Sequence, residues 1–319
     1  MIDNFVNLHL HTEYSMMDSI IKIPKLFTKI EEYGQSAVAI TDHGDIAGWY
    51  DFQTLAKNTT VKPIFGCEFY CKPGLEKPST RTRYHLIVLA KNNNGLRKIR
   101  EFQKISIKHH YYKPLLPYPI LFENPGDIFI TTACALGSVG HALNPTDKAH
   151  HSDLAEVFIN KLLDTFGKDN VACEFQFHPT FKDENGIYIQ NVINEKLFDL
   201  CEDIKPKYMI ATCDSHFLDQ DDRKIRRKII AEKLKKQENE VEESLKSNCV
   251  GNSKLIKQFA KESDFSNIDT VPKMLEDTVK ISNILNAEIP LNYGKVIPKF
   301  NKHKELKANF MKGRKQVMK

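Results

Sequence analysis

The sequence predicts an α/β fold in which seven strands alternate with helices, as in a β/α barrel or a doubly wound sheet. Two observations support this prediction. Short apolar runs recur along the first two thirds of the chain, and amphipathic stretches lie between them. Most of these runs lack polar alternation, which is typical of strands buried on both faces, so we expect parallel pairing beneath covering helices.

Seven apolar runs are the candidate strands, and polar or turn residues bound each of them. In chain order they are NFVNLHLH (4–11), SAVAIT (36–41), VKPIFGCEFY (61–70), YHLIVLA (84–90), DIFITTA (127–133), NVACEFQF (170–177) and KYMIAT (207–212). Two stretches have helical periodicity, KIPKLFTKIEEYG at 22–34 and SDLAEVFINKLLDTFG at 152–167. Each ends in glycine, which commonly terminates a helix, so we expect a helix over each stretch.

The same signals divide the chain into regions. Segment 105–125 interrupts the alternation with aromatic residues and prolines, which predicts a loop-rich excursion over one end of the barrel. Strand signals stop after residue 217, and helical patterns continue beyond it. We expect a barrel domain over 1–220, a helical extension over 221–290, and a basic linker or tail over 291–319.

The composition is that of an ordinary globular protein, since 41% of the 319 residues are hydrophobic and 27% are charged. No apolar run approaches the roughly 18 residues of a membrane span, and the N-terminus lacks the pattern of a secretory signal. We therefore expect a cytoplasmic protein without a membrane partner. The seven cysteines are an odd number spread over the chain, which favours free thiols, one of which could be a metal ligand.

Positive charge is concentrated in two segments. Residues 222–236 hold eight basic and two acidic side chains, and residues 301–319 hold seven basic and one acidic. Such segments suit a polyanionic partner, although a solvated helix face followed by a frayed tail would have the same composition.

The first candidate strand carries two histidines. Residues two apart in a strand face the same way, so His9 and His11 project together. A single histidine there would fit a hydrogen-bonded place in the core. A pair at this spacing, followed by Asp18, favours a metal site.

Further polar groups stand in or just after other apolar runs. They are Asp42, His43, Glu68, Cys134, Asp214 and His216. Asp214 and His216 repeat the spacing of His9 and His11, and Glu68 lies in an apolar strand where an unpaired carboxylate would be strongly destabilising. Because the carboxyl ends of barrel strands and their loops converge, we expect these groups to cluster. Glu174, Gln176 and His178 alternate on another strand and could line the same cleft or its rim.

Imidazole, carboxylate and thiolate ligands together suit Zn, with Mn or Fe as alternatives. So many candidate ligands exceed the needs of one ion, which favours two or three neighbouring divalent ions. Such a centre is typical of phosphoester cleavage, because one metal acidifies a bound water while its neighbours stabilise the phosphate and the leaving oxygen.

Five segments resemble the motifs of the polymerase and histidinol phosphatase (PHP) domain family, in the version found at the N-terminus of bacterial DNA polymerase III alpha subunits. In order they are LHLHTEYSMMDS, AITDHG, GCEFY, RYHLIVLA and TCDSHFL. The resemblance is strong over residues 3 to 220 and continues weakly to about residue 300. It implies a distorted seven-stranded β/α barrel of PHP type with a helical C-terminal extension and a trinuclear metal site.

The resemblance also implies a ligand set. The metal ligands would be His9, His11, Asp18, His43, Glu68, His85, Cys134, Asp214 and His216. Glu68, Asp214, His216 and Asp42 would serve catalysis, with Glu68 bridging two ions and Asp42 orienting a ligand or the local turn. His85 follows from the resemblance alone, because it lies near the start of its strand and the barrel rule points to strand ends.

We expect a metal-dependent 3′ to 5′ exonuclease of proofreading type that acts on the primer 3′ end of DNA within a DNA polymerase III alpha system. The segment NYGKVIPKF lies about where the polymerase palm would begin in the family, so we expect no polymerase activity from this chain alone. A second chain could supply the palm. A phosphomonoesterase of the histidinol phosphatase kind and a non-catalytic module that docks a polymerase core are the alternatives.

Overall fold

A computed structural model gives the fold of the chain. It describes residues 3–78, 82–123, 125–146, 151–177, 189–238 and 247–291. The expected basic tail therefore lies outside the described residues, apart from its first position. All the described helices and strands belong to one compact unit, Met1–Ile289.

Seven strands form one curled sheet, in the order β1-β2-β3-β5-β6-β7, with β4 beside β2. Their bounds are β1 Ala37–Ile40, β2 Lys62–Lys72, β3 Tyr84–Ala90, β4 Leu116–Pro117, β5 Ile128–Thr131, β6 Val171–Gln176 and β7 Tyr208–Thr212. The predicted α/β class with a distorted seven-stranded barrel is confirmed.

The segment NFVNLHLH, predicted as the first strand, is not a regular strand. Asn7 forms a parallel bridge with Val38 of β1, and Leu10 forms another with Ser215 just after β7. The segment therefore changes partner along its length and joins the two edges of the sheet. The seventh strand of the sheet is instead the two-residue β4, which lies in the predicted loop-rich excursion.

The prediction of parallel pairing is wrong for β3. This strand is antiparallel to both β2 and β5, whereas the β1–β2, β5–β6 and β6–β7 pairs are parallel. A strand buried on both faces reads the same in either direction, so its apolar pattern carries no information on polarity. The reversal brings the first residues of β3 to the end of the sheet where its neighbours finish.

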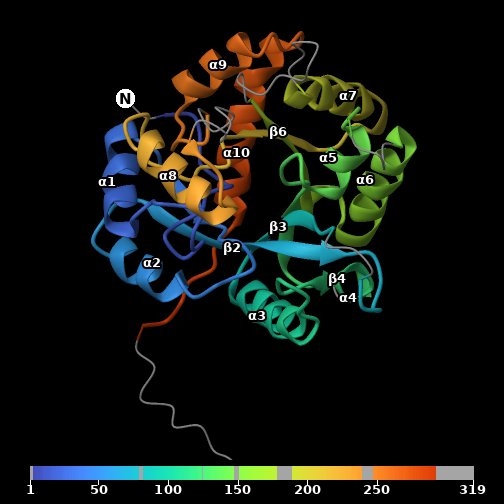
Figure 1. Cartoon of the computed structure of the whole chain (residues 1–319), viewed down its shortest axis with the longest axis horizontal. Coiled ribbons are helices and arrows are strands. Elements are labelled where there is room, and N and C mark those ends of the chain that lie inside the picture. The colour runs from blue at the N-terminus through green and yellow to red at the C-terminus, as the bar shows by residue number, and fades with distance from the viewer. Residues whose placement is uncertain are drawn as a thin grey trace, which may run out of the picture. The chain divides into compact units, whose positions relative to one another are not determined.

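Ten α-helices lie around this sheet in the described part of the chain (Figure 1). They are α1 Ile23–Tyr33, α2 Trp49–Ala56, α3 Asn93–Lys108, α4 Tyr118–Glu123, α5 Ser138–Leu143, α6 Ser152–Phe166, α7 Ile189–Ile204, α8 Arg223–Leu234, α9 Ser253–Glu262 and α10 Val271–Ile284. As predicted, α1 ends at Gly34, whose φ of 69° is a left-handed conformation that glycine adopts without strain. No helix among the described residues is both long and apolar enough to cross a membrane.

The inner face of the sheet is apolar at one end and polar at the other. Side chains of one face alternate along a strand, so β6 presents Ala172, then Glu174 and Gln176, and β7 presents Ile210, then Thr212. The apolar residues of this face form a buried cluster that includes side chains of α10. The opposite end, where most strands finish, is therefore the polar end of the barrel.

The helices after residue 220 pack into the same unit as the barrel. Val6 donates its backbone N–H to Thr278 Oγ1 at 2.9 Å, and Ile281 of α10 is fully buried in the inner cluster. Figure 1 shows α10 crossing behind the sheet and α8 lying in front of it. The predicted domain boundary at residue 220 stays a prediction, but α10 completes the core of the barrel.

Candidate metal centre

Three groups of side chains converge at the polar end of the barrel. In each group, three ligand atoms lie within 4.8 Å of one another. The groups are His9, His11 and Asp214; His11, His43 and His216; and His43, Glu68 and His85. Because His11 and His43 each belong to two groups, the three form one continuous cluster from seven of the nine predicted ligands.

The first group has the spacing of ligands around a single ion. His9 Nε2 lies 3.2 Å from His11 Nε2 and 3.1 Å from Asp214 Oδ1, and the His11–Asp214 distance is 3.2 Å. Ligands bound tetrahedrally to zinc at 2.0–2.1 Å are separated by about 3.3 Å. The fit to a divalent metal is therefore close.

Glu68 lies at the centre of the cluster. Its Oε1 is 2.9 Å from His85 Nδ1 and 3.4 Å from His9 Nε2, while its Oε2 contacts His43 Nδ1 and lies 3.6 Å from His11. The two oxygens thus face different histidines, as a bridging carboxylate requires. Burial would raise the pKa of Glu68, but the imidazoles of His85 and His43 outweigh it and hold the pKa well below the usual range.

Two buried oxygens support a cation at this place. Glu68 Oε2 and Asp214 Oδ1 are inaccessible to solvent and accept no conventional hydrogen bond from the described residues. A buried carboxylate oxygen that accepts no hydrogen bond is destabilising unless a positive charge lies beside it. The imidazole, carboxylate and thiol donors present are those that Zn, Mn or Fe accept.

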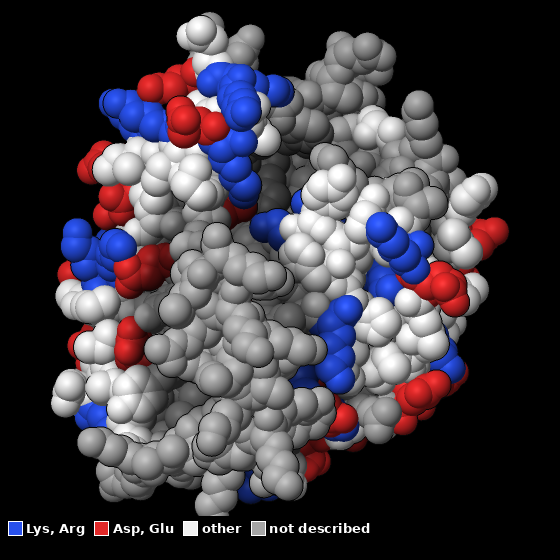
Figure 2. Space-filling view, turned by 60° about the horizontal axis from the view of Figure 1, so that its bottom comes forward, with Lys and Arg blue, Asp and Glu red and all other residues white. Residues whose placement is uncertain are grey.

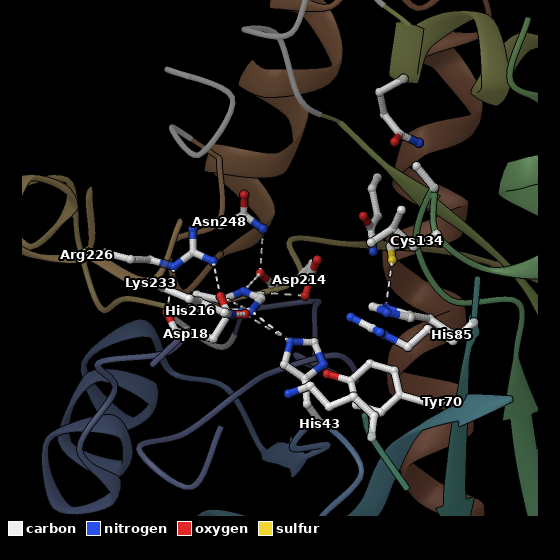
Figure 3. A pocket seen from close by; sticks show the side chains of 16 residues that line it. Asp18, His43, Tyr70, His85, Cys134, Asp214, His216, Arg226, Lys233 and Asn248 are labelled. Carbon is white, nitrogen blue, oxygen red and sulfur yellow. Dashed lines mark hydrogen bonds and ion pairs between the residues drawn. The ribbon is translucent and has the colours of Figure 1, made fainter. Parts of the chain in front are cut away.

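Asp18 lies between the histidines and helix α8. Its carboxylate is 3.6 Å from His216 Nε2 and 3.8 Å from His43 Nε2, and it also binds Arg226 at 2.8 Å and Lys233 at 2.6 Å (Figure 3). Burial would raise the pKa of Asp18, but these two imidazoles and two cations lower it. The structure therefore brings Asp18 beside the cluster, bound to the basic helix.

Cys134 and His85 reach the cluster from the opposite side in Figure 3. Cys134 Sγ is 3.5 Å from His85 Nδ1 and 3.9 Å from Glu68 Oε1, and burial raises the pKa of this thiol. His85 is the second residue of the antiparallel β3, which begins at the polar end of the barrel. Its place near the start of a strand is thus the position that a ligand needs.

Asp42 stands behind the cluster rather than in it. Its carboxylate accepts the backbone N–H of Thr12 at 2.6 Å and the Ser15 hydroxyl at 2.7 Å, and Ser15 Oγ lies 3.1 Å from His11 Nδ1. Asp42 therefore contacts the turn that follows His11, and its orienting role stays a prediction. Direct participation of Asp42 in catalysis stays a prediction.

Glu174 supports His9 from inside the barrel. Its Oε1 lies 2.6 Å from His9 Nδ1 and accepts the Thr212 hydroxyl at 2.6 Å, and its Oε2 accepts the Thr131 hydroxyl. A carboxylate in this position fixes the orientation of a ligand histidine and leaves Nε2 free for metal. Gln176 also lies within 3.3 Å of His9 Nδ1, whereas His178 is outside the described residues.

A cavity of about 410 Å³ opens over the cluster, and four cations line it. They are Arg83, Lys113, Arg226 and Lys233. Sequence reasoning marked the basic run 222–236 but no individual residue in it, and it missed Arg83 and Lys113. The excess of basic residues in 222–236 was the only signal for Arg226 and Lys233. No pattern in the sequence identified Arg83 and Lys113.

The PHP domain family matches residues 7–178, more than half of the chain. The chain belongs to the PHP domain family. A relative of the chain, DNA polymerase III subunit alpha from Aquifex aeolicus, is 33% identical over 249 residues, which are 74% of this chain and 20% of that protein.

Two further PHP relatives have the same name. The DNA polymerase III alpha subunit of Helicobacter pylori strain J99 is 32% identical over 69% of this chain and 18% of its own length. That of Saccharopolyspora erythraea is 31% identical over 69% of this chain and 20% of its own length. The chain spans about a fifth of the length of these relatives.

Proposed function

We propose that this PHP chain is a metal-dependent phosphodiesterase that removes nucleotides from DNA 3′ ends within a DNA polymerase III alpha system. The observation that carries the proposal is the continuous cluster of ligand groups joined through His11 and His43. The relationship of the chain to polymerase III alpha subunits favours DNA over a small phosphomonoester as the substrate.

Divalent ions, two or three of them, would lower the pKa of a bound water and stabilise the leaving oxygen. The residues of the chain have separate tasks. Glu68, His9 and His11 would hold these ions, Glu174 would orient His9, and the cations over the cavity would attract the phosphate backbone.

The primer 3′ end is the proposed DNA partner. A polymerase palm, contributed by a second chain or by another part of a longer protein, is a further proposal, supported by the length of the related alpha subunits. Co-purification of a palm-containing chain with this one would support it, and a stable, active chain that binds no such partner would count against it.

A nuclease assay tests the proposed activity. Purified chain is incubated with a 3′-labelled primer–template and Mn or Zn, and release of the labelled nucleotide is followed. We expect release by the wild type and by a Glu101→Gln control, because Glu101 is an exposed residue that pairs with Lys98 at the surface, away from the cluster. His9→Ala and Asp214→Asn should lose the activity.

Two other outcomes would contradict the proposal and indicate a different function. Rapid hydrolysis of histidinol phosphate together with inert DNA would indicate a phosphomonoesterase. A folded chain that binds almost no metal and hydrolyses neither substrate would indicate a structural module.

A further inference from the structure

A second cavity adjoins the one over the metal ligands. It has a volume of about 400 Å³, within the usual range for a small-ligand site. The two cavities share five lining residues, which are Asp18, His43, Tyr70, Lys113 and Lys233. A ligand whose reacting group lies over the cluster can therefore extend into the second cavity, past Lys113 and Lys233.

The second cavity offers two exposed thioether side chains. Met16 is 81% exposed and Met17 is 50% exposed, and Tyr14 and Pro114 also line this cavity. Scattered single apolar side chains on a surface need no explanation, but two adjacent methionines beside a candidate metal centre do. Methionine packs favourably against flat aromatic groups, and its flexible side chain adapts to their shape.

The loop that carries the methionines is held in place. Met17 has a φ of 61°, which a residue with a side chain seldom adopts, and the turn around it is fixed by bonds from Asp18 N and Ser19 N to Ser15 O at 3.1 and 3.0 Å. Tyr14 Oη donates to Asp51 Oδ2 at 2.5 Å and ties the loop to α2. Met16 and Met17 are thus exposed on a loop whose backbone is held by hydrogen bonds.

The boundary between the cavities is positively charged. Lys113 and Arg83 lie over the ring of Tyr70, at 5.4 and 5.2 Å from its centroid. Burial lowers the pKa of Lys113, the charge repulsion of the neighbouring cations Lys233 and Arg83 lowers it further, and Asp18 raises it. Figure 2 shows Lys and Arg side chains beside a hollow in the surface. A phosphate between these cations would relieve the repulsion.

We propose that the second cavity is a nucleoside subsite, in which Met16 and Met17 pack against a base while Lys113 and Lys233 bind the phosphate that joins it to the cluster. The site would then select a nucleotide strand, with a nucleoside adjoining the scissile phosphate, over a simple phosphomonoester. This inference rests on the proposed function for its substrate class, but the binding that it predicts can be measured without catalysis.

Fluorescence anisotropy of a labelled single-stranded oligonucleotide with phosphorothioate linkages, which resist hydrolysis, tests the subsite on the metal-loaded chain. Met16→Ser together with Met17→Ser should weaken binding about tenfold, which corresponds to the loss of one base-packing contact. A Leu75→Ser control, at a 51% exposed position that lines neither cavity, should bind as the wild type does. Equal affinity of the double variant and the wild type, or no binding by the wild type, would overturn the proposal.

The salt dependence of oligonucleotide binding tests the proposed contact between Lys113 and the phosphate. Each contact with a single strand contributes about 0.7 to the slope of log affinity against log salt concentration, so Lys113→Gln should reduce the slope by about that amount. Lys257→Gln, at an exposed position outside both cavities, should leave the slope unchanged. An unchanged slope for Lys113→Gln would remove the phosphate from the proposal.

The subsite and the proposed function fail in different ways. Methionine-dependent binding without any nucleotide release would support the subsite and contradict the exonuclease. Nucleotide release that is the same for the double methionine variant and the wild type would support the exonuclease and contradict the subsite.

Discussion

Individual residues at the candidate centre depend on partners that are not ligands themselves. Glu174 is buried, and although burial would raise its pKa, contact with His9 and with the hydroxyls of Thr131 and Thr212 lowers it. The carboxylate therefore stays charged beside His9. A negative charge at this position increases the basicity of the histidine and hence its affinity for metal.

Glu174→Gln keeps the shape of the side chain and removes its charge. We expect metal affinity to fall by about 10- to 100-fold, as for other carboxylates that support a ligand histidine. Competition with a chromophoric chelator measures this affinity. Glu101→Gln is the matched control on an exposed side chain, and equal affinity of the two variants would contradict the role of Glu174.

The hydroxyl of Tyr14 predicts a dependence of stability on pH. Its hydrogen bond to Asp51 raises the pKa of Tyr14 to about 12, above the value of about 10 expected for an unfolded chain. The folded state thus retains a proton that the unfolded state releases, so this stabilisation is complete below pH 10 and is lost as the pH rises towards 12.

Urea unfolding of the wild type and of Tyr14→Phe measures this contribution. The difference in the free energy of unfolding should be largest at pH 8 and should shrink from about pH 10 upwards. A difference that stays constant up to pH 11 would contradict the assignment.

At the scale of elements, most strands could be predicted from the sequence, but the antiparallel direction of β3 could not. Six of the seven apolar runs became strands, because burial on both faces leaves a clear apolar signal. The direction of β3 depends on its partners β2 and β5, which local sequence does not reveal. His85 accordingly reached the predicted ligand set only through family resemblance, and the antiparallel pairing explains its position.

The close pairing of β2 with β3 leaves no room for a side chain at Gly66. A Cβ atom there would lie 2.5 Å from Leu89 Cδ2 and 2.7 Å from the carbonyl oxygen of Val88. Gly66→Ala should lower the free energy of unfolding by about 1 to 3 kcal/mol through overpacking. Gly74→Ala, where the added Cβ meets nothing within 4 Å, should leave urea unfolding almost unchanged. Equal stabilities would contradict this packing.

A buried arginine attaches helix α8 to the centre, together with Lys233 of the same helix. Arg226 donates Nε to the Asp18 carbonyl at 2.9 Å and Nη2 to its carboxylate at 2.8 Å, and it is only 4% exposed. Arg226→Met should destabilise the fold by about 3 kcal/mol, because it leaves a partly buried carboxylate short of a partner.

Lys228→Met is the matched control, since Lys228 is an exposed residue of the same helix. Thermal or urea unfolding should distinguish the two variants. Equal stability would contradict the anchoring role of Arg226.

At the scale of the whole molecule, the clustering of distant residues was predictable, but the cavity above them was not. Polar groups near strand ends must meet in a barrel, which is why Asp214 and His216 could be associated with His9 and His11. The cavity is lined from strands β2, β3 and β6, from helices α7 and α8 and from loops between them, and this convergence leaves no periodic signal in the sequence. Arg83 and Lys113 therefore look like ordinary basic residues until the chain is folded.

The central claim is that this cluster holds several divalent ions through His9 and His11. Mass spectrometry of metals in the purified, reconstituted chain tests it directly, with circular dichroism to check folding. We expect about two or three ions per wild-type chain and clearly fewer in a folded His9→Ala/His11→Ala variant. A double variant that keeps the full metal content of the wild type would contradict the claim.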